Sequence, residues 1–284
     1  MNSSHPAFAA LAPWLSESVD AMTLDELNAC AASRQYPPRS DSGAAIRFVS
    51  PAGSPSGADY EPEILLTGAV PTRTASRHDA FNALCWIAFP AFKRACNAVH
   101  AAQLAEDVGS ERSTERGALR DALTLLDESG VIVLCTDSSL VDLLVRREWK
   151  ALFVDRRADV KKALRFLVCG HALYEKLLDP YPAITGRALV IPAPATLFGR
   201  EVNAQREFGD ENAARLLRAG ITTTQIPPLP LAGIPGWAPG NEAPAFYDDA
   251  SVFRPFHPAT VAGSKSTSAH SASAPAALSS SAEP

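Results

Sequence analysis

The alternation of apolar and polar positions predicts short helices and short strands in turn. Thr23 and Glu26 form a capping box, in which each residue satisfies an open amide of the other, and apolar residues follow at helical spacing. We therefore expect a helix over residues 23–33. Brief apolar runs at 46–49 and 64–67, between stretches rich in Pro, Ser and Gly, predict two strands.

Two consecutive helices are expected on either side of Pro90. Ser76 is placed to cap the first helix, which Pro90 ends or kinks because proline cannot donate a helical hydrogen bond. A second helical stretch covers 91–106, and the polar residues 107–117 predict a loop.

The pattern then changes to two apolar runs, Ala122–Leu126 and Val131–Cys135. Asp127 and Glu128 lie between them, followed by Ser129 and Gly130, which are common in turns. The second run is rich in β-branched residues. This arrangement predicts a β-hairpin whose two acidic turn residues face solvent.

The second half of the chain predicts further short elements before an irregular segment. These are a helix capped by Ser138 or Ser139, a strand or helix end at 164–169, a helix at 171–178, a strand at 188–191 and a helix at 211–218 followed by Gly220. Prolines, glycines and aromatic residues over 227–255 predict a segment that wraps the domain.

These elements predict an α+β fold, since they lack the regular β–α–β rhythm of a parallel sheet. We expect a single domain over residues 1–258, with a helical pair packed against a small antiparallel sheet built on the 122–135 hairpin and an irregular C-terminal wrap. Residues 259–284 contain eight serines and eight alanines. Such a segment buries too little apolar area to offset its ordering entropy and predicts a disordered tail.

Composition narrows the function classes. The 284-residue chain is 46% apolar and carries a formal net charge of −5, which disfavours a dedicated nucleic-acid binder. Its five cysteines form no C-x-x-C pair and lie in apolar contexts, as buried free thiols of a reducing cytosol do. We find no secretory signal, and no apolar run approaches the ~20 residues that span a bilayer. A cytoplasmic location without membrane contact is therefore expected.

The helical pair carries the strongest candidate site. His78 and Asn82 are four positions apart, and Lys93, Asn97 and His100 repeat this spacing on the second helix. A bend at Pro90 would bring two imidazoles and two carboxamides together. Such a cluster suits metal binding, proton transfer or substrate orientation, and it also suits hydrogen bonding within a helix crossing.

Three further residues are candidates for the same pocket. His171 begins a predicted helix, where the helix dipole favours a neutral imidazole fit for a general base, although a contact with Glu175 explains it as well. Arg120 and Asp121 precede the predicted turn and face opposite sides of a strand, so at most one reaches a pocket. Arg120 suits either an anion clamp at the rim or an ion pair.

No metal site is predicted, because neither H-x-x-x-H nor H-E-x-x-H occurs. The dipeptide His78-Asp79 occurs in one class of metal phosphohydrolases but is weak evidence alone. No G-x-S-x-G elbow, Walker loop or G-x-G-x-x-G motif is present, and no cofactor is identified.

A local basic face gives a separate candidate. Arg157, Lys161 and Arg165 share one face of a helical pattern and suit contact with phosphate or nucleic acid. Acidic residues interleave with the basic ones, for example Asp142 with Arg146, as on a solvated and self-paired surface.

Several blocks of the chain carry a resemblance to known proteins. They are Arg77–Trp86 with Phe89, Pro90, Lys93, Asn97 and His100; Arg116–Gly130; Gly170–Leu178; and Gly233–Glu242 with Phe246–Asp249. Together they resemble one family, the bacterial proteins grouped as domain of unknown function 3025. The resemblance covers roughly Pro13 to Pro255 and implies one domain. It supplies no activity, cofactor or catalytic residue.

Three hypotheses for function follow. The first is a small cytoplasmic enzyme, hydrolytic in type, whose pocket is lined by His78, Asn82, Asn97, His100 and His171, with Arg120 or Asp121 at its rim. The second is a non-catalytic binding or scaffold protein in which these side chains organise the core. The third is a contact with phosphate or nucleic acid through the basic face. No partner is identified. We do not expect the chain to bind a membrane or a nucleic acid.

Overall fold

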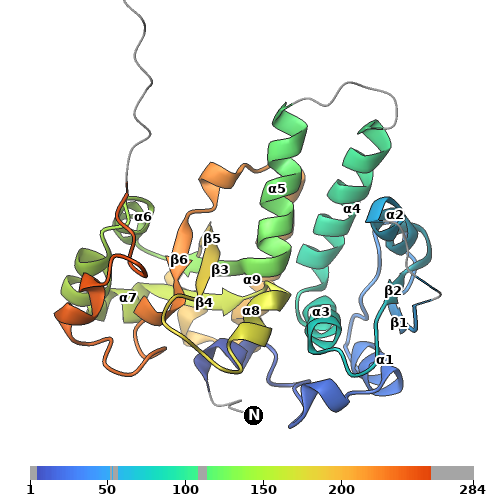
Figure 1. Cartoon of the computed structure of the whole chain (residues 1–284), viewed down its shortest axis with the longest axis horizontal. Coiled ribbons are helices and arrows are strands. Elements are labelled where there is room, and N and C mark those ends of the chain that lie inside the picture. The colour runs from blue at the N-terminus through green and yellow to red at the C-terminus, as the bar shows by residue number, and fades with distance from the viewer. Residues whose placement is uncertain (1–4, 52, 54–56, 108–113, 257–284) are drawn as a thin grey trace, which may run out of the picture.

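The computed structural model describes residues 5–51, 53, 57–107 and 114–256 of the chain (Figure 1). The predicted tail at 259–284 and residues 108–113 of the predicted loop lie outside this part, and the domain boundary at residue 258 stays a prediction.

The fold is α+β, as the pattern predicted. Its helices are α1 (Leu24–Ala32), α2 (Gly57–Thr67), α3 (Arg77–Ala88), α4 (Pro90–Asp107), α5 (Thr114–Ser129), α6 (Ser138–Val145), α7 (Arg157–Ala163), α8 (His171–Lys176) and α9 (Val202–Ala219). Its strands are β1 (Arg47–Val49), β2 (Ala69–Pro71), β3 (Gly130–Cys135), β4 (Leu164–Val168), β5 (Thr185–Pro192) and β6 (Pro228–Pro230).

Two sheets flank the long helices. Figure 1 shows α4 and α5 side by side, with the four-stranded sheet beside α5 and the strands β1 and β2 beyond α4. The larger sheet has the order β4-β3-β5-β6, and the smaller one pairs β1 with β2 in parallel. Every residue of β3 is buried, because this strand is central and α9 packs on the sheet. The hydrophobic core therefore lies between the larger sheet and the helices.

The predicted antiparallel hairpin at 122–135 is wrong. Ala122–Leu126 belongs to helix α5, which continues through Asp127 and Glu128 to Ser129. Strand β3 pairs with β4 in an antiparallel manner and with β5 in a parallel manner, so the sheet is mixed. A run of five apolar residues fits a helix as well as a strand, and here helical packing decides the outcome.

The strand predicted at 64–67 is also wrong, because these residues form the end of α2. Ile64 is buried while Leu66 is 70% exposed, which is a helical and not an extended arrangement in this segment. The strand at 46–49 is confirmed as β1.

The break between the paired helices is confirmed. The hydroxyl of Ser76 accepts the amide hydrogen of Asp79 at 3.2 Å and caps α3, and Pro90 is the first residue of α4. Asp210 of α9 completes the break, because its carboxylate accepts the amides of Ala91 and Phe92 at 3.0 and 2.7 Å. These amides have no acceptor within their own helix.

The C-terminal wrap is confirmed as an irregular segment held by side chains. The hydroxyl of Tyr247 donates toward the carbonyls of Gly233 and Asn241, and the amide of Asn241 donates to the carbonyls of Ala232 and Ile234. The segment therefore satisfies its backbone groups without forming a long strand.

The predicted basic face is not one continuous helical surface. Helix α7 ends at Ala163, so Arg165 lies on strand β4. The guanidinium of Arg157 donates to both oxygens of Asn241, and that of Arg165 donates to the backbone and lies over Phe198. Arg157 and Arg165 thus hold parts of the fold together.

No helix in the described part of the chain combines the length and the apolar character needed to cross a membrane.

A glycine sets the distance between α5 and α8. Gly170 precedes α8, and a Cβ atom placed on it would lie 2.3 Å from the amide nitrogen of Gly130 and 2.5 Å from that of Ser129. Only a residue without a side chain allows the backbone at this point to come so close to the end of α5.

We expect Gly170→Ala to lower the free energy of unfolding by about 3 kcal/mol, because the added methyl group meets backbone atoms that cannot turn aside. Gly117→Ala is the matched control, since its Cβ would meet nothing within 4 Å on helix α5 and should stabilise by ~0.5 kcal/mol. Urea unfolding of both variants checks this, and equal midpoints would contradict it.

Candidate functional site

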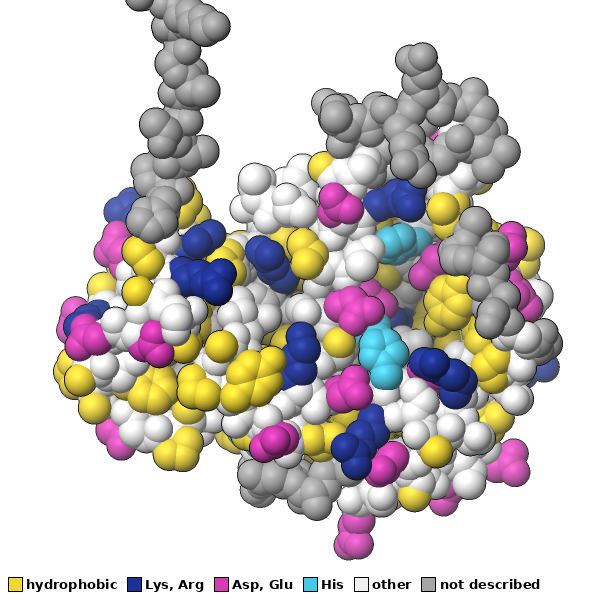
Figure 2. All heavy atoms as spheres, in the orientation of Figure 1, with side chains coloured by type: hydrophobic (Ala, Val, Ile, Leu, Met, Phe, Trp, Pro, Cys, Tyr) yellow, Lys and Arg dark blue, Asp and Glu magenta, His cyan; other side chains and the backbone are white. Residues whose placement is uncertain are grey.

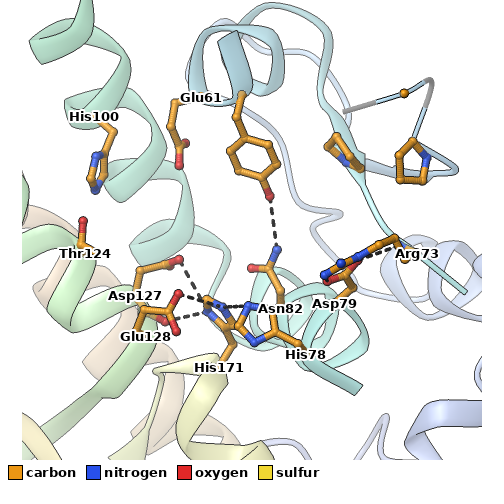
Figure 3. Close-up of a pocket in the computed structure, with 14 residues that line it drawn as sticks. Glu61, Arg73, His78, Asp79, Asn82, His100, Thr124, Asp127, Glu128 and His171 are labelled. Carbon is orange, nitrogen blue, oxygen red and sulfur yellow. Dashed lines mark hydrogen bonds and ion pairs between the residues drawn. The ribbon is translucent and has the colours of Figure 1, made fainter. Parts of the chain in front are cut away.

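A polar cavity of about 510 Å³ lies where α2, α3, α4, α5 and α8 meet. Figure 3 shows its side chains converging from these helices, and on the face in Figure 2 histidine side chains lie beside acidic ones. The polar residues that concern us are Glu61, His78, Asn82, His100, Glu128 and His171.

Two imidazoles meet in the cavity wall. The Nε2 atom of His78, on α3, lies 3.1 Å from the Nε2 atom of His171, at the start of α8. The ring centroids are 4.5 Å apart and the ring planes are inclined by 75°. The sequence separates these residues by 93 positions, and the fold makes them neighbours.

Oxygen atoms hold the outer nitrogen of each ring. Nδ1 of His171 lies 2.7 Å from the backbone carbonyl oxygen of Asp127, and Nδ1 of His78 lies 3.5 Å from a carboxylate oxygen of Glu175. A carbonyl only accepts hydrogen bonds, so Nδ1 of His171 carries the proton. In the neutral ring Nε2 then presents a lone pair to His78.

A carboxylate completes the group. Oε1 of Glu128 lies 3.6 Å from Nε2 of His171, and the ligand-type atoms of His78, Glu128 and His171 all lie within 4.8 Å of one another. His171 is 5% exposed, whereas the side chains of His78 and Glu128 are 39% and 42% exposed. The group is therefore anchored at one residue and open to the cavity at two.

A buried ion pair lies beneath this group. The side chain of Lys93 is 5% exposed, and its ammonium group contacts the carboxylate of Asp127 and donates to the side-chain oxygen of Asn82 at 2.8 Å. It also lies 5.6 Å from the centre of the Trp86 ring. Lys93 thus connects α4 to both α3 and α5.

Burial and charge shift several pKa values at the site. Burial lowers the pKa of His171 and of His100, and it raises the pKa of Glu61 to about 6. Burial alone would raise the pKa of Asp127, but the charges of Lys93 and His171 outweigh it and leave that pKa lowered. The cavity therefore combines ionised and neutral groups at close range.

Four of the five predicted pocket residues line this cavity, namely His78, Asn82, His100 and His171. His100 is on α4 and lies apart from the histidine pair, above it in the view of Figure 3. Asn97 lies behind the wall, where its amide donates to the backbone carbonyl and to the carboxylate of Glu61 at 2.9 and 2.6 Å. Asn97 lines a smaller adjoining hollow together with His100 and Asp127, and it fastens α2 to α4.

Arg120 and Asp121 do not line the cavity, contrary to their predicted place at the rim. The argument that they face opposite sides of a strand is wrong because both lie on helix α5. Asp121 is exposed, and Arg120 is half-buried and acts on His100 through its charge, which adds to burial in lowering the pKa of that ring.

Asp79, the second residue of the His78-Asp79 dipeptide, points away from the histidines. Its carboxylate accepts two hydrogen bonds from the guanidinium of Arg73, both at 2.9 Å, and one from the backbone amide of Arg73 at 2.7 Å. The dipeptide therefore does not supply two ligands to one site.

Sequence reasoning missed Asp127, Glu128 and Glu175 as members of the site. The first two were assigned to a solvated turn, although Leu119, Ala122 and Leu126 repeat at helical spacing and could have placed them on a helix end. Glu175 was considered for His171, but it contacts His78. The absence of a predicted metal site rested on motif spacing, which does not detect ligands that come from three separate helices.

A family model described as "Protein of unknown function (DUF3025)" matches residues 46–257, which is more than half of the chain. No curated protein and no solved structure matches.

Removing one partner of the buried ion pair should be costly. We expect Lys93→Met to lower the free energy of unfolding by about 3–5 kcal/mol, since it leaves the Asp127 carboxylate uncompensated, and Lys93→Met with Asp127→Asn to recover part of this. Lys150→Met is the control, because Lys150 pairs with Asp248 in solvent and should cost at most ~1 kcal/mol. Thermal and urea unfolding compare the variants, and equal losses would refute a special role for Lys93.

Proposed function

We propose that this chain, which belongs to the DUF3025 family of proteins of unknown function, is a hydrolase that acts in the cavity beside His78 and His171. One observation carries the proposal: the two Nε2 atoms lie 3.1 Å apart in the wall of a polar cavity. Each outer nitrogen faces an oxygen atom, so both reactive nitrogens are turned toward the same point.

This arrangement suits the activation of a water molecule. With Nδ1 of His171 protonated by its contact with a carbonyl, the Nε2 lone pair is available on the side of His78 and Glu128. A fixed imidazole of this kind raises the nucleophilicity of a water molecule in one of two ways. It accepts a proton from the water, or it binds a cationic group that polarises the water.

Two residues are placed to orient a substrate. Asn82 and His100 line the same cavity, and their amide and ring N–H groups suit the oxygen atoms of an ester, amide or phosphoester. Asn82 is itself oriented, because its side-chain oxygen accepts from Lys93.

A second candidate, the non-catalytic binding protein, is favoured by the internal networks of Lys93 with Asp127 and of Asn97 with Glu61. These contacts explain Lys93 and Asn97 as elements of the core. They do not explain His78, whose side chain is 39% exposed at the cavity. We therefore place hydrolysis first.

A cytoplasmic location belongs to the same proposal. Cys85, Cys96, Cys135 and Cys169 are buried and unpaired, and free thiols are typical of a reducing compartment.

Hydrolytic activity can be tested with p-nitrophenyl acetate and p-nitrophenyl phosphate as probes of ester and phosphoester cleavage. We expect the full chain to hydrolyse at least one probe, and His78→Gln to lower kcat/KM by about 10²–10⁴-fold, the usual contribution of a positioned imidazole. His100→Ala should lower activity while the melting temperature stays nearly unchanged.

His5→Gln serves as the control, because His5 contacts the carbonyl of Trp237 and does not line the cavity. Activity that is equal in wild type and His78→Gln would come from elsewhere and would overturn the proposal. Absence of hydrolysis with esters, amides and phosphoesters in a probe panel would favour the binding protein.

A further inference from the structure

We infer that His78, Glu128 and His171 together bind one divalent transition-metal ion of the zinc type. The inference deepens the proposed function, since it rests on the same cavity and names what the histidine pair holds there. Each ligand comes from a different helix, α3, α5 or α8.

The spacing of the two nitrogens fits a shared ion. Zinc–imidazole bonds of about 2.0–2.1 Å in a tetrahedral site place two nitrogens roughly 3.3 Å apart. The observed separation of the Nε2 atoms is 3.1 Å, and all three ligand-type atoms lie within 4.8 Å of one another. The ligand atoms therefore surround a common point closely enough to be bridged by one ion.

The outer contacts are those of metal-binding histidines. Such a histidine usually donates its other ring N–H to a backbone carbonyl or a carboxylate, which fixes the orientation of the ring. Nδ1 of His171 meets the carbonyl oxygen of Asp127 at 2.7 Å, and Nδ1 of His78 faces Glu175 at 3.5 Å. Because Nδ1 of His171 donates to that carbonyl, the Nε2 lone pair of His171 is free to bind a cation together with Nε2 of His78.

The local charge also favours a dication. Within the described residues, two other carboxylates of the cavity wall already have cationic partners, Asp79 with Arg73 and Asp127 with Lys93. The carboxylates of Glu128 and Glu175 instead contact the two histidines. A divalent ion between the rings would balance these two charges.

The ligand types select the class of ion. Two imidazoles and one carboxylate suit zinc and neighbouring transition metals, whereas magnesium and calcium prefer oxygen ligands. Three protein ligands also leave a position for water, whose pKa such an ion lowers toward neutrality.

Calorimetry on the full chain tests this inference. After dialysis against EDTA, we expect wild type to bind one Zn²⁺ per chain and to bind Mg²⁺ far more weakly. His78→Gln and Glu128→Gln should each weaken Zn²⁺ binding at least tenfold, and Glu175→Gln should weaken it about 10–100-fold through the orientation of His78. Both ligand variants change partly exposed side chains, so they remain informative if a variant at the buried His171 does not fold.

His5→Gln is the matched control, because this histidine lies outside the cavity and should leave Zn²⁺ affinity unchanged. Zn²⁺ binding that is absent in wild type, or equal in wild type and both ligand variants, would mean that the rings share only a hydrogen bond. A chain that binds Zn²⁺ but hydrolyses no probe retains this inference and loses the proposed function. Undiminished hydrolysis by a chain that binds no Zn²⁺ would retain the proposed function and overturn this inference.

Discussion

The buried ion pair between Lys93 and Asp127 is the interaction on which the site depends. The side chain of Lys93 is 5% exposed, and a buried ammonium group needs a compensating charge, which Asp127 supplies from the last turn of α5. Lys93 also donates to Asn82, so one cation fixes α3, α4 and α5 together. Since His78 and Asn82 share a face of α3, this pair holds one side of the cavity in place.

The bend at Pro90 gives Lys93 its position, and a distant residue stabilises that bend. Proline ends α3 by its chemistry, but the first amides of α4 need an acceptor in the protein interior. Asp210 provides it from α9, more than a hundred residues later in the chain. The helix break was therefore visible in the sequence, whereas the group that satisfies it was not.

The same difference between local and distant groups explains which elements the sequence predicted and which it did not. Local signals were sufficient where one residue determines the outcome, as for the Ser76 cap, the break at Pro90 and the start of α8 at His171. They failed at Ala122–Leu126, because a short apolar run does not distinguish a helix from a strand and the decision lies in packing against distant elements. That single error moved Glu128 from the cavity into solvent, and it hid the third member of the group formed by His78 and His171.

Asp127 acts on the site through two separate groups. One sets the orientation of His171, and the other sets the charge around Lys93. Its backbone carbonyl fixes the ring of His171, and this contact depends on the close approach of α5 and α8 at Gly170. Its carboxylate compensates Lys93. A backbone acceptor holds a ring whatever side chain the residue carries, so the geometry of the histidine pair follows from the fold. The surrounding charge follows from side chains, and because Lys93 neutralises Asp127, the more exposed Glu128 is left to act toward the cavity.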